Sequence, residues 1–422
     1  MEKTLRKIEK LIPKSVYKFF QPFYHFLLAV IGTIIYRFPS RKIYVIGVTG
    51  TKGKSSTTEF INTILEEAGF KTAILSTIRF KIGEESKPNK FKMTMPGRFF
   101  TQKFLRDAVD AGCKYAIIEM TSEGARFYRH IGVSMNVLIF TNLSPEHIES
   151  HGGFNNYKNA KLRLIKHLAK SKKQNRLSIA NTDDTHGTGF LVYDVDKNIP
   201  YGIKDVQIIN ENENNSEIIY DNTAINIPLP GRFNILNALS AIKLAKELNI
   251  SNEAIKKGLE NLKLIRGRVE KINEGQDFTV VVDYAHTDDS LRKLYETFGS
   301  SRKIAVLGST GGGRDTWKRP VMGKVADENC QEIILTNEDP YDENPTKIIN
   351  EIASGIKNHE PKIILDRREA IRYAISIAQK NDVILITGKG TDPYIMGKNG
   401  SKEKWDDAEV AREELRKIQN TR

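Results

Sequence analysis

Hydrophobic and polar positions show two kinds of pattern along most of the chain, one typical of strands and one typical of helices. Short apolar runs at 114–120, 136–141 and 177–180 predict buried strands, and amphipathic stretches at 101–111, 155–170 and 234–248 predict helices. A second alternating series begins near Arg266, and its predicted strands are 279–283, 303–308, 332–336, 362–365 and 382–387. Strands that alternate with helices indicate an α/β fold, with a doubly wound central domain and a smaller Rossmann-like domain after it. The Asn- and Glu-rich stretch 210–216 predicts an exposed loop or hairpin edge.

The alternation suggests three parts. A chain of 422 residues is long enough for two or three domains with full cores. We predict a basic and hydrophobic N-terminal segment over 1–42, a central domain over 43–265 and a C-terminal domain over 266–422.

The N-terminal segment has a composition of its own. Its apolar run at 23–36 is about 14 residues long, shorter than the ~20 that span a bilayer. Basic residues lie on both sides of this run: Lys3, Arg6, Lys7, Lys10, Lys14, Lys18, Arg37, Arg41 and Lys42. Two interpretations stay open. Residues 1–40 could anchor the protein at an anionic membrane surface, or they could form a helix packed on the rest of the protein.

Composition and charge limit the cellular compartment and the binding partners that the sequence predicts. Cys113 and Cys330 are the two cysteines, which fits a reducing cytosol and no disulfide framework. The net charge of +13 comes without an aromatic-interleaved basic tract, so a nucleic-acid partner is not predicted. A polyanionic nucleotide substrate and the basic N-terminus explain the excess more simply. We expect a cytoplasmic monomer, with a place at the inner face of the membrane if residues 1–40 bind there.

A phosphate-binding loop follows the first apolar strand of the central domain. After Val48 and Thr49 the chain reads Gly50-Thr51-Lys52-Gly53-Lys54-Ser55-Ser56 and then enters an amphipathic helix. In such a loop, backbone N–H groups and the helix N-terminus cradle a triphosphate, Lys reaches its outer oxygens, and Ser can ligate Mg²⁺. These seven residues are the predicted ATP site. Val48 stands where the common pattern has Gly, so the loop is a variant.

Polar residues gather where the predicted strands end. Glu119 lies at the end of one predicted strand of the central domain, and Asn142 and His147 come at and after the end of the next. Clusters at 283–286, 308–314, 337–340 and 388–390 follow strands of the C-terminal domain. Open α/β sheets bind ligands at the carboxyl ends of their strands. A single polar residue at such a position usually only forms a turn. Several clusters that contain charged residues predict a ligand-binding site instead.

Together the motifs resemble those of the Mur ligase family, nearest to the branch that adds the third amino acid of the peptidoglycan stem. The resemblance covers about 43–422. It rests on Gly50–Ser55, Glu119–Gly124, Phe140–His147, Tyr157–Lys161, Gly231–Ala238, Asp283–Thr287 and Gly388–Gly390. Folylpolyglutamate synthetases share the loop, but the Asp-Tyr-Ala-His segment favours the Mur branch.

The resemblance implies roles for individual residues. Lys54, Glu119, His147 and Lys161 would be catalytic; Glu119 and His147 would hold Mg²⁺ with Ser55, and Lys161 would be carbamylated so that a new carboxylate supports the metal site. For Lys161 alone, a solvated helix lysine is the commoner fate. Asn234 and Asn237 match residues that meet the adenine end of ATP. Thr94, Met95, Ser122 and Arg129 match acceptor-binding residues. The amino-acid pocket would consist of Arg314, Glu338, Asp339, Pro340, Tyr341, Gly388 and Asp392.

Departures from the family pattern bear on the substrates. The UDP-binding first domain has no counterpart, since about 42 residues precede the loop strand; Glu123 replaces a usual His; and the glycine loop before Arg314 has an extra residue. Where diaminopimelate-adding members read Asp-Asn-Pro-Arg, this chain reads Glu338-Asp339-Pro340-Tyr341. Tyr341 cannot pair bidentately with a carboxylate as Arg does. A side chain ending in an amine, such as lysine, is therefore expected, with Asp339 or Asp392 as its partner.

The expected activity is ATP-dependent joining of an amino acid to a muramoyl-peptide acceptor through an acyl phosphate. One rival is a ligase of the same superfamily that uses another acceptor, such as poly-γ-glutamate or a lipid-linked muropeptide. A rival of another class is a non-catalytic nucleotide-binding scaffold at the membrane. Lys54, Glu119, His147 and Lys161 argue against the scaffold. His286 is expected either to orient groups of the site or to anchor a loop.

Overall fold

The computed structural model of the protein describes residues 14–419, and the predicted basic positions Lys3, Arg6, Lys7 and Lys10 lie outside this range. Contacts divide the chain into two compact units. The first unit contains the described residues up to Gly50 together with Gly69–Asn142 and Lys158–Tyr201. The second unit contains Thr51–Ala68, Leu143–Tyr157 and the chain from Gly202 onward. The predicted domain boundaries at 42 and 265 stay predictions.

The first unit is built on an eight-stranded sheet of order β4-β3-β2-β5-β1-β6-β7-β8. Six strands are parallel, and β3 and β4 extend one edge in antiparallel pairing. The bounds are β1 Tyr44–Thr49, β2 Thr72–Leu75, β3 Arg79–Ile82, β4 Glu85–Pro88, β5 Tyr115–Met120, β6 Val137–Phe140, β7 Leu177–Asn181 and β8 Lys197–Tyr201. Strands β1, β5 and β6 are almost wholly buried, which explains their nearly continuous apolar sequences.

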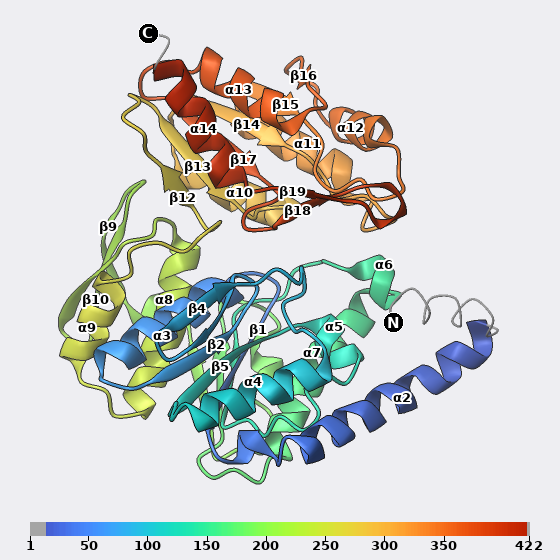
Figure 1. Cartoon of the computed structure of the whole chain (residues 1–422). Coiled ribbons are helices and arrows are strands. Elements are labelled where there is room, and N and C mark those ends of the chain that lie inside the picture. Colours follow the sequence, from blue (N-terminus) through green and yellow to red (C-terminus); the bar gives the residue numbers. More distant parts are fainter. Residues whose placement is uncertain (1–13, 420–422) are drawn as a thin grey trace. The chain divides into compact units, whose positions relative to one another are not determined.

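Helices of the first unit come from both ends of its sequence. They are α2 Lys14–Ile35, α4 Arg98–Asp110, α5 Ser122–Arg126 and most of α7 Phe154–Ala169, with short 3₁₀ turns at Pro39–Arg41 and Gly187–Phe190. Helix α2 runs beside α4 (Figure 1). Its residues Ala29 and Thr33 are buried. Close packing explains Gly132, because a Cβ there would lie 1.8 Å from the Thr33 hydroxyl. The second half of α2 is therefore a packed helix.

The second unit begins with α3 Lys54–Glu67, which packs against α8 Arg232–Glu247 and α9 Asn252–Glu260. A three-stranded antiparallel sheet of β9 Gln207–Glu211, β10 Ser216–Tyr220 and β11 Thr223–Ile227 lies beside α9. This unit also contains α6 Ile148–His151 and a 3₁₀ turn at Ile203–Asp205. The hairpin predicted around 210–216 is confirmed, since β9 and β10 flank that turn.

The larger sheet of the second unit has the order β12-β13-β17-β14-β15-β16, parallel except for β12. Its strands are β12 Glu270–Ile272, β13 Thr279–Asp283, β14 Lys303–Leu307, β15 Glu332–Leu335, β16 Lys362–Ile363 and β17 Val383–Thr387. Its helices are α10 Asp288–Thr297, α11 Lys318–Asn329, α12 Pro345–Ala353, α13 Arg367–Ile377 and α14 Asp407–Gln419. A small ribbon of β18 Tyr394–Met396 and β19 Lys402–Lys404 follows β17, with a 3₁₀ turn at Lys398–Gly400 between them.

Alternate residues of this sheet enter two separate cores. Val281 and Ala305 pack with residues of α10, α11 and α12, whereas Val280 and Ile304 pack with α13 and α14. Helices thus cover both faces, which confirms the predicted α/β class (Figure 1). The antiparallel additions were not predicted, because short polar strands give little periodic signal. Within residues 14–419, none of the helices combines the length and apolarity that crossing a membrane requires.

Candidate active site

The phosphate-binding loop joins β1 to α3, and its glycines are required by close neighbours. A Cβ at Gly50 would lie 1.9 Å from the Thr141 hydroxyl. Gly53 has a φ of +83°, and a Cβ there would lie 2.2 Å from Oδ1 of Asn237 on α8. Asn237 in turn donates to Asn234, 3.3 Å away. Both asparagines predicted for ATP are therefore buried and Asn237 lies against the loop, while their contact with adenine stays a prediction.

Side chains of the phosphate-binding loop form hydrogen bonds with the loop backbone and with neighbouring segments of the chain. Lys54 Nζ donates to the Thr51 carbonyl at 2.8 Å. The Thr51 hydroxyl accepts the N–H of Ser144 at 3.0 Å and is 2.8 Å from the Tyr157 hydroxyl. Ser55 is buried at the start of α3, and Arg268 Nη2 lies 3.4 Å from its Oγ. Lys54 and Ser55 thus occupy the helix N-terminus, where a polyphosphate is best stabilised.

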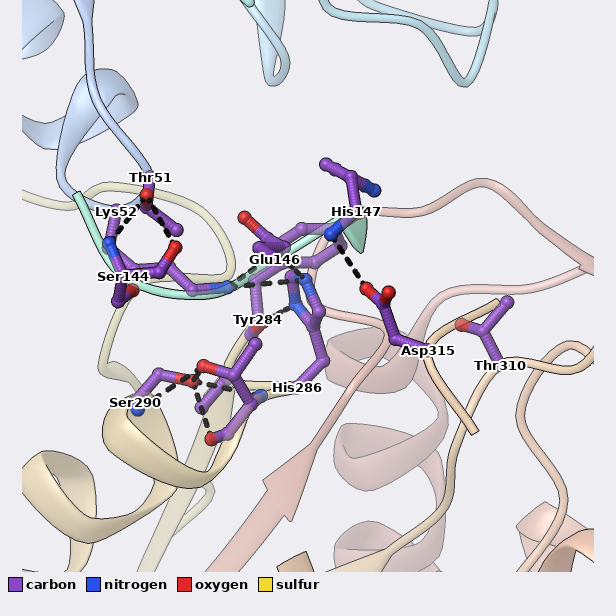
Figure 2. A network of polar contacts seen from close by, with 12 residues as sticks. Thr51, Lys52, Ser144, Glu146, His147, Tyr284, His286, Ser290, Thr310 and Asp315 are labelled. Carbon is purple, nitrogen blue, oxygen red and sulfur yellow. Dashed lines mark hydrogen bonds and ion pairs between the residues drawn. The ribbon is translucent and has the colours of Figure 1, made fainter. Parts of the chain in front are cut away.

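A charged triad within the second unit involves the loop residue Lys52 (Figure 2). Lys52 Nζ lies 3.0 Å from Oε1 of Glu146 and 3.2 Å from Nε2 of His286. His286 Nε2 is also 2.6 Å from the Glu146 carboxylate, and its Nδ1 is 2.6 Å from the Tyr284 carbonyl. His286 therefore contacts both the backbone of its own loop and the Glu146 carboxylate, and a role in orienting groups of the site stays a prediction.

Electrostatics keep Glu146 ionised. Burial alone would raise its pKa, but Lys52, the hydrogen bond with His286 and the charge of His147 outweigh burial and hold the pKa well below its usual range. Burial followed by the Lys52 charge lowers the pKa of His286 to about 4, against the opposing effect of Glu146. Glu146 belongs to the motif Phe140–His147, but it was assigned no role from the sequence. Its position next to His147 was the signal that could have identified it as a site residue.

We expect Glu146→Gln to lower the free energy of unfolding by about 3 kcal/mol at pH 7, because Lys52 would lose its buried partner. The depressed pKa means that this stability is fully present above about pH 4.5 and is lost as the pH falls through the lowered value. Urea unfolding at pH 7 and pH 3 measures both. Glu296→Gln, at an exposed position of α10, is the control. Equal unfolding curves for the two variants at pH 7 would contradict the role of the triad.

His147 is the N-cap residue before α6 and has a left-handed conformation, with a φ of 56°. Its backbone N–H donates to Asp315 at 2.7 Å (Figure 2). The N–H of Glu149 lies 3.4 Å from the same carboxylate. Asp315 is buried and was not predicted. The contact fixes the turn that carries His147.

In the first unit, the Glu119 side chain is fully buried at the carboxyl end of β5. Its two oxygens accept the backbone N–H of Thr77 at 3.1 Å and the Thr77 hydroxyl at 2.7 Å. The same hydroxyl is 2.9 Å from that of Thr94, a predicted acceptor residue. Thr77, which follows β2, was missed by the sequence interpretation although it also lies at a strand end. It connects Glu119 to the predicted acceptor position.

Lys161 is buried in α7, with 2 % of its surface exposed. Its Nζ donates to the Gly50 carbonyl at 2.6 Å. The alternative of a solvated helix lysine is therefore wrong. The predicted carbamate remains a prediction, and the side chain lies against the loop that it is expected to serve.

The other predicted acceptor residues lie near one another. A Cβ at Gly124 of α5 would lie 2.3 Å from Sδ of Met95. The guanidinium of Arg129 donates to the Met95 carbonyl. Ser122 is buried at the first turn of α5, whose N-cap Thr121 accepts the N–H of Gly124 at 2.9 Å. Thr94, Met95, Ser122 and Arg129 all belong to the first unit.

The predicted amino-acid residues belong to the second unit, where Glu338 and Gly388 fit together. Glu338 accepts the Thr310 hydroxyl at 2.6 Å, while its other oxygen is buried without a partner. A Cβ at Gly388 would lie 2.4 Å from that oxygen. Burial, followed by the charge of Asp339, raises the pKa of Glu338. Gly388 therefore makes room for a carboxyl group that resists ionisation.

Asp339 is already paired inside the protein. It accepts Lys389 Nζ at 2.8 Å and the N–H of Met396 at 2.8 Å. Lys389 is fully buried and also lies 3.7 Å from Asp392. The exposed Arg314 sits 5.3 Å over the ring of Tyr341. The pairing makes Asp339 poorly suited to receive a substrate ammonium, and the expected role of Asp392 stays a prediction.

The four predicted magnesium ligands divide between the units, with Glu119 and Lys161 in the first and Ser55 and His147 in the second. Over residues 14–419, no group of three or more His, Cys, Asp or Glu side chains converges as a metal site. Mg²⁺ commonly takes one or two carboxylates together with phosphate oxygens and waters. Ser55 and Glu119 each supply a hard oxygen donor of the kind that Mg²⁺ prefers, and their assignment to one ion stays a prediction.

Comparison with protein families gives two matches along the chain. The model of the Mur ligase middle domain matches residues 48–245, and that of the Mur ligase, glutamate ligase domain, matches residues 267–390.

Individual proteins agree with these matches. The chain is 37 % identical over 404 residues to the UDP-N-acetylmuramoyl-L-alanyl-D-glutamate–2,6-diaminopimelate ligase of Syntrophomonas wolfei, covering 92 % of this chain and 81 % of that protein. It is 35 % identical to a UDP-N-acetylmuramyl-tripeptide synthetase of a Roseiflexus species, covering 93 % and 82 %. A solved structure of a UDP-N-acetylmuramoyl-L-alanyl-D-glutamate–2,6-diaminopimelate ligase superposes with a TM-score of 0.60 at 27 % identity, covering 89 % of this chain and 79 % of that one.

Proposed function

The chain belongs to the Mur ligase family, and from that premise we propose that it joins an amino acid to a muramoyl-peptide acceptor in peptidoglycan precursor synthesis. It is an ATP-dependent ligase, as members of this family are. The observation that carries the proposal is the buried lysine of α7 against the phosphate-binding loop, where Lys161 donates to Gly50. Together with Lys54, Glu119 and His147, this lysine argues against a scaffold that only binds nucleotide.

The reaction we propose has two steps. The acceptor carboxylate attacks the γ-phosphorus of ATP, which gives an acyl phosphate and ADP. The uncharged amine then attacks the acyl carbon through a tetrahedral intermediate, phosphate leaves, and the amine loses a proton. Lys54 and the N–H groups at the start of α3 would stabilise the transferring phosphoryl group, where electrostatics supply most of the catalysis.

Mg²⁺ would be held by Ser55, Glu119, His147 and the carbamylated Lys161, and it would neutralise phosphate charge when bound. The buried Glu119 carboxylate is kept in one orientation by Thr77. Thr77 would therefore position Glu119 and Thr94 together, so that the metal side and the acceptor side of the site are connected.

Amino-acid-dependent release of ADP tests the proposal, using a panel of UDP-linked, UDP-free and lipid-linked muropeptides, with poly-γ-glutamate as the rival acceptor. Release with a muropeptide supports the function. Release with poly-γ-glutamate alone would favour the rival ligase. No release with any acceptor would indicate a nucleotide-binding scaffold.

For the amino acid, we predict a preference for lysine or a similar diamine over meso-diaminopimelate. Tyr341 lies where an Arg would bind the distal carboxylate, and it carries Arg314 over its ring. We expect a distal ammonium to pair with Asp392, where it would compete with Lys389 at 3.7 Å. The names of the relatives, most of which are diaminopimelate ligases, point the other way. We expect kcat/KM to favour lysine by about tenfold, which corresponds to about 1.4 kcal/mol.

Competition between the two amino acids at one acceptor measures this preference. Asp392→Asn should remove it, whereas Asp342→Asn, in the same region of the chain, is the control. A clear preference of the wild-type enzyme for meso-diaminopimelate would refute the prediction.

We further propose that α2 brings the enzyme to the cytoplasmic face of the membrane. Phe23, Leu27, Ile31 and Ile34 recur at helical spacing and are 66 %, 45 %, 37 % and 56 % exposed. No Asp or Glu occurs between residues 10 and 58, so the helix and its flanks carry only positive charge. Apolar area and basic charge are the two signals that stable peripheral binding requires.

Leu27→Glu combined with Ile34→Glu should abolish sedimentation with anionic vesicles at low salt, where attraction is least screened. Val192→Glu, at a residue of the first unit that is 77 % exposed, is the matched control. Point substitutions are preferable to deletion of residues 1–40, because the opposite face of α2 is packed. Failure of the wild-type protein to bind such vesicles would leave α2 as a packed helix only.

A further inference from the structure

A basic cluster lies where α2 packs on the first unit. Its members are His25 from α2, Arg98 at the first position of α4, and Arg129, which follows α5. The His25 ring meets the Phe127 ring edge to face at 5.3 Å, and Arg98 donates to the Phe127 carbonyl. Arg129 donates to the Met95 carbonyl, beside the predicted acceptor residues. Three distant segments thus bring three basic side chains to one place.

Each member of the cluster retains a polar atom that is buried without a hydrogen-bond partner. These atoms are Nδ1 of His25, Nε of Arg98 and Nε of Arg129. A buried donor that lacks an acceptor destabilises the folded state. The fold therefore holds three unsatisfied groups together, and an acceptor from outside the chain would satisfy them.

Carboxylates do not neutralise the cluster. Across the described part of the chain, neither Arg98 nor Arg129 forms an ion pair, although the charge of Glu123 acts on Arg129 from a distance. The buried Arg367 of the second unit differs, because Asp407 binds it at 2.7 Å. Burial and the charge of Arg129 lower the pKa of Arg98 to about 10. Burial, Arg98 and Arg129 lower the pKa of His25 to about 4.

We propose that His25, Arg98 and Arg129 form a subsite for a phosphate-class anion carried by the acceptor. Guanidinium groups match the geometry of phosphate oxygens, and the N-terminus of the 13-residue helix α4 adds a favourable dipole. His25 makes the N-terminal helix part of acceptor recognition. The word acceptor rests on the proposed ligase function, whereas the anion site rests on the cluster alone.

The test is an NMR titration of ¹³C-labelled histidine in the full-length protein with inorganic pyrophosphate. An anion in the cluster opposes the field of the two arginines, so the pKa of His25 should rise by about one unit or more. Arg98→Gln and Arg129→Gln should each weaken pyrophosphate binding at His25 by about tenfold or more, and Arg98→Lys should restore part of it. Arg163→Gln, at an exposed position of α7 in the same unit, should change the affinity less than twofold.

Two further measurements distinguish the possible causes of the His25 response. Lys54→Ala removes pyrophosphate binding at the nucleotide loop and should leave the His25 response intact. Vesicles that contain phosphatidic acid present the same chemistry on a lipid, and comparison with free pyrophosphate assigns the source. Circular dichroism shows that each variant is folded.

The proposal is overturned if saturating pyrophosphate and phosphatidic acid both leave His25 unmoved, or if folded Arg98→Gln responds like the wild type. A response to acetate that exceeds the response to pyrophosphate would overturn the assignment to phosphate. The titration needs neither ATP nor an amino acid, so its failure and the failure of the ligase function are separate results.

Discussion

Lys54→Ala should reduce ATP-dependent ligation by about 10²–10³-fold or more while the protein stays folded. Lys54 begins α3 and is not part of a hydrophobic core. Its Nζ bonds the loop carbonyl of Thr51 at 2.8 Å, which keeps the ammonium over the loop. Removal takes away a positive charge aimed at the phosphates, where a preorganised charge contributes most to the transition state.

ADP release at saturating ATP measures the loss, and thermal unfolding checks the fold. Lys324→Ala, whose side chain is 67 % exposed on α11, is the control and should keep full activity. Lys54→Ala with near-normal turnover would show that this loop is not the catalytic ATP site.

Lys161→Ala is expected to be nearly inactive and to regain part of its activity with small carboxylates such as acetate. Lys161 is buried, and its Nζ lies 2.6 Å from the Gly50 carbonyl at the start of the loop. If the side chain carries a carbamate, the substitution removes an anionic oxygen ligand that a small carboxylate can replace. A lysine with a purely structural role would show the loss without the rescue.

Bicarbonate dependence and a high-resolution structure with ATP and Mg²⁺ examine the carbamate directly. Lys166→Ala, exposed on the same helix, is the control. A bare ammonium at Lys161 in that structure, together with no rescue by acetate, would contradict the prediction.

The local sequence determined the alternating strands and helices of this protein. The alternation of apolar strands and amphipathic helices predicted the two parallel sheets, because each period matches the geometry of one element. The strand, Gly50–Ser55 and the following helix identified the phosphate loop for the same reason, since all of its parts are neighbours in the chain. The strand-end positions of Glu119 and His147 followed from the sheet class, because parallel strands present their carboxyl ends on one edge.

Tertiary structure alone decided which side chains meet. The sequence around Lys161 suits a solvated helix as well as a buried one, and only packing against Gly50 places it inside. Asp339 had been expected to face a substrate, but Lys389, 50 residues further along the chain, is bound to it. The cluster of His25, Arg98 and Arg129 joins segments about 30–100 residues apart. Periodicity reports which face of an element is buried, whereas the partner on that face is chosen by long-range packing of the whole fold.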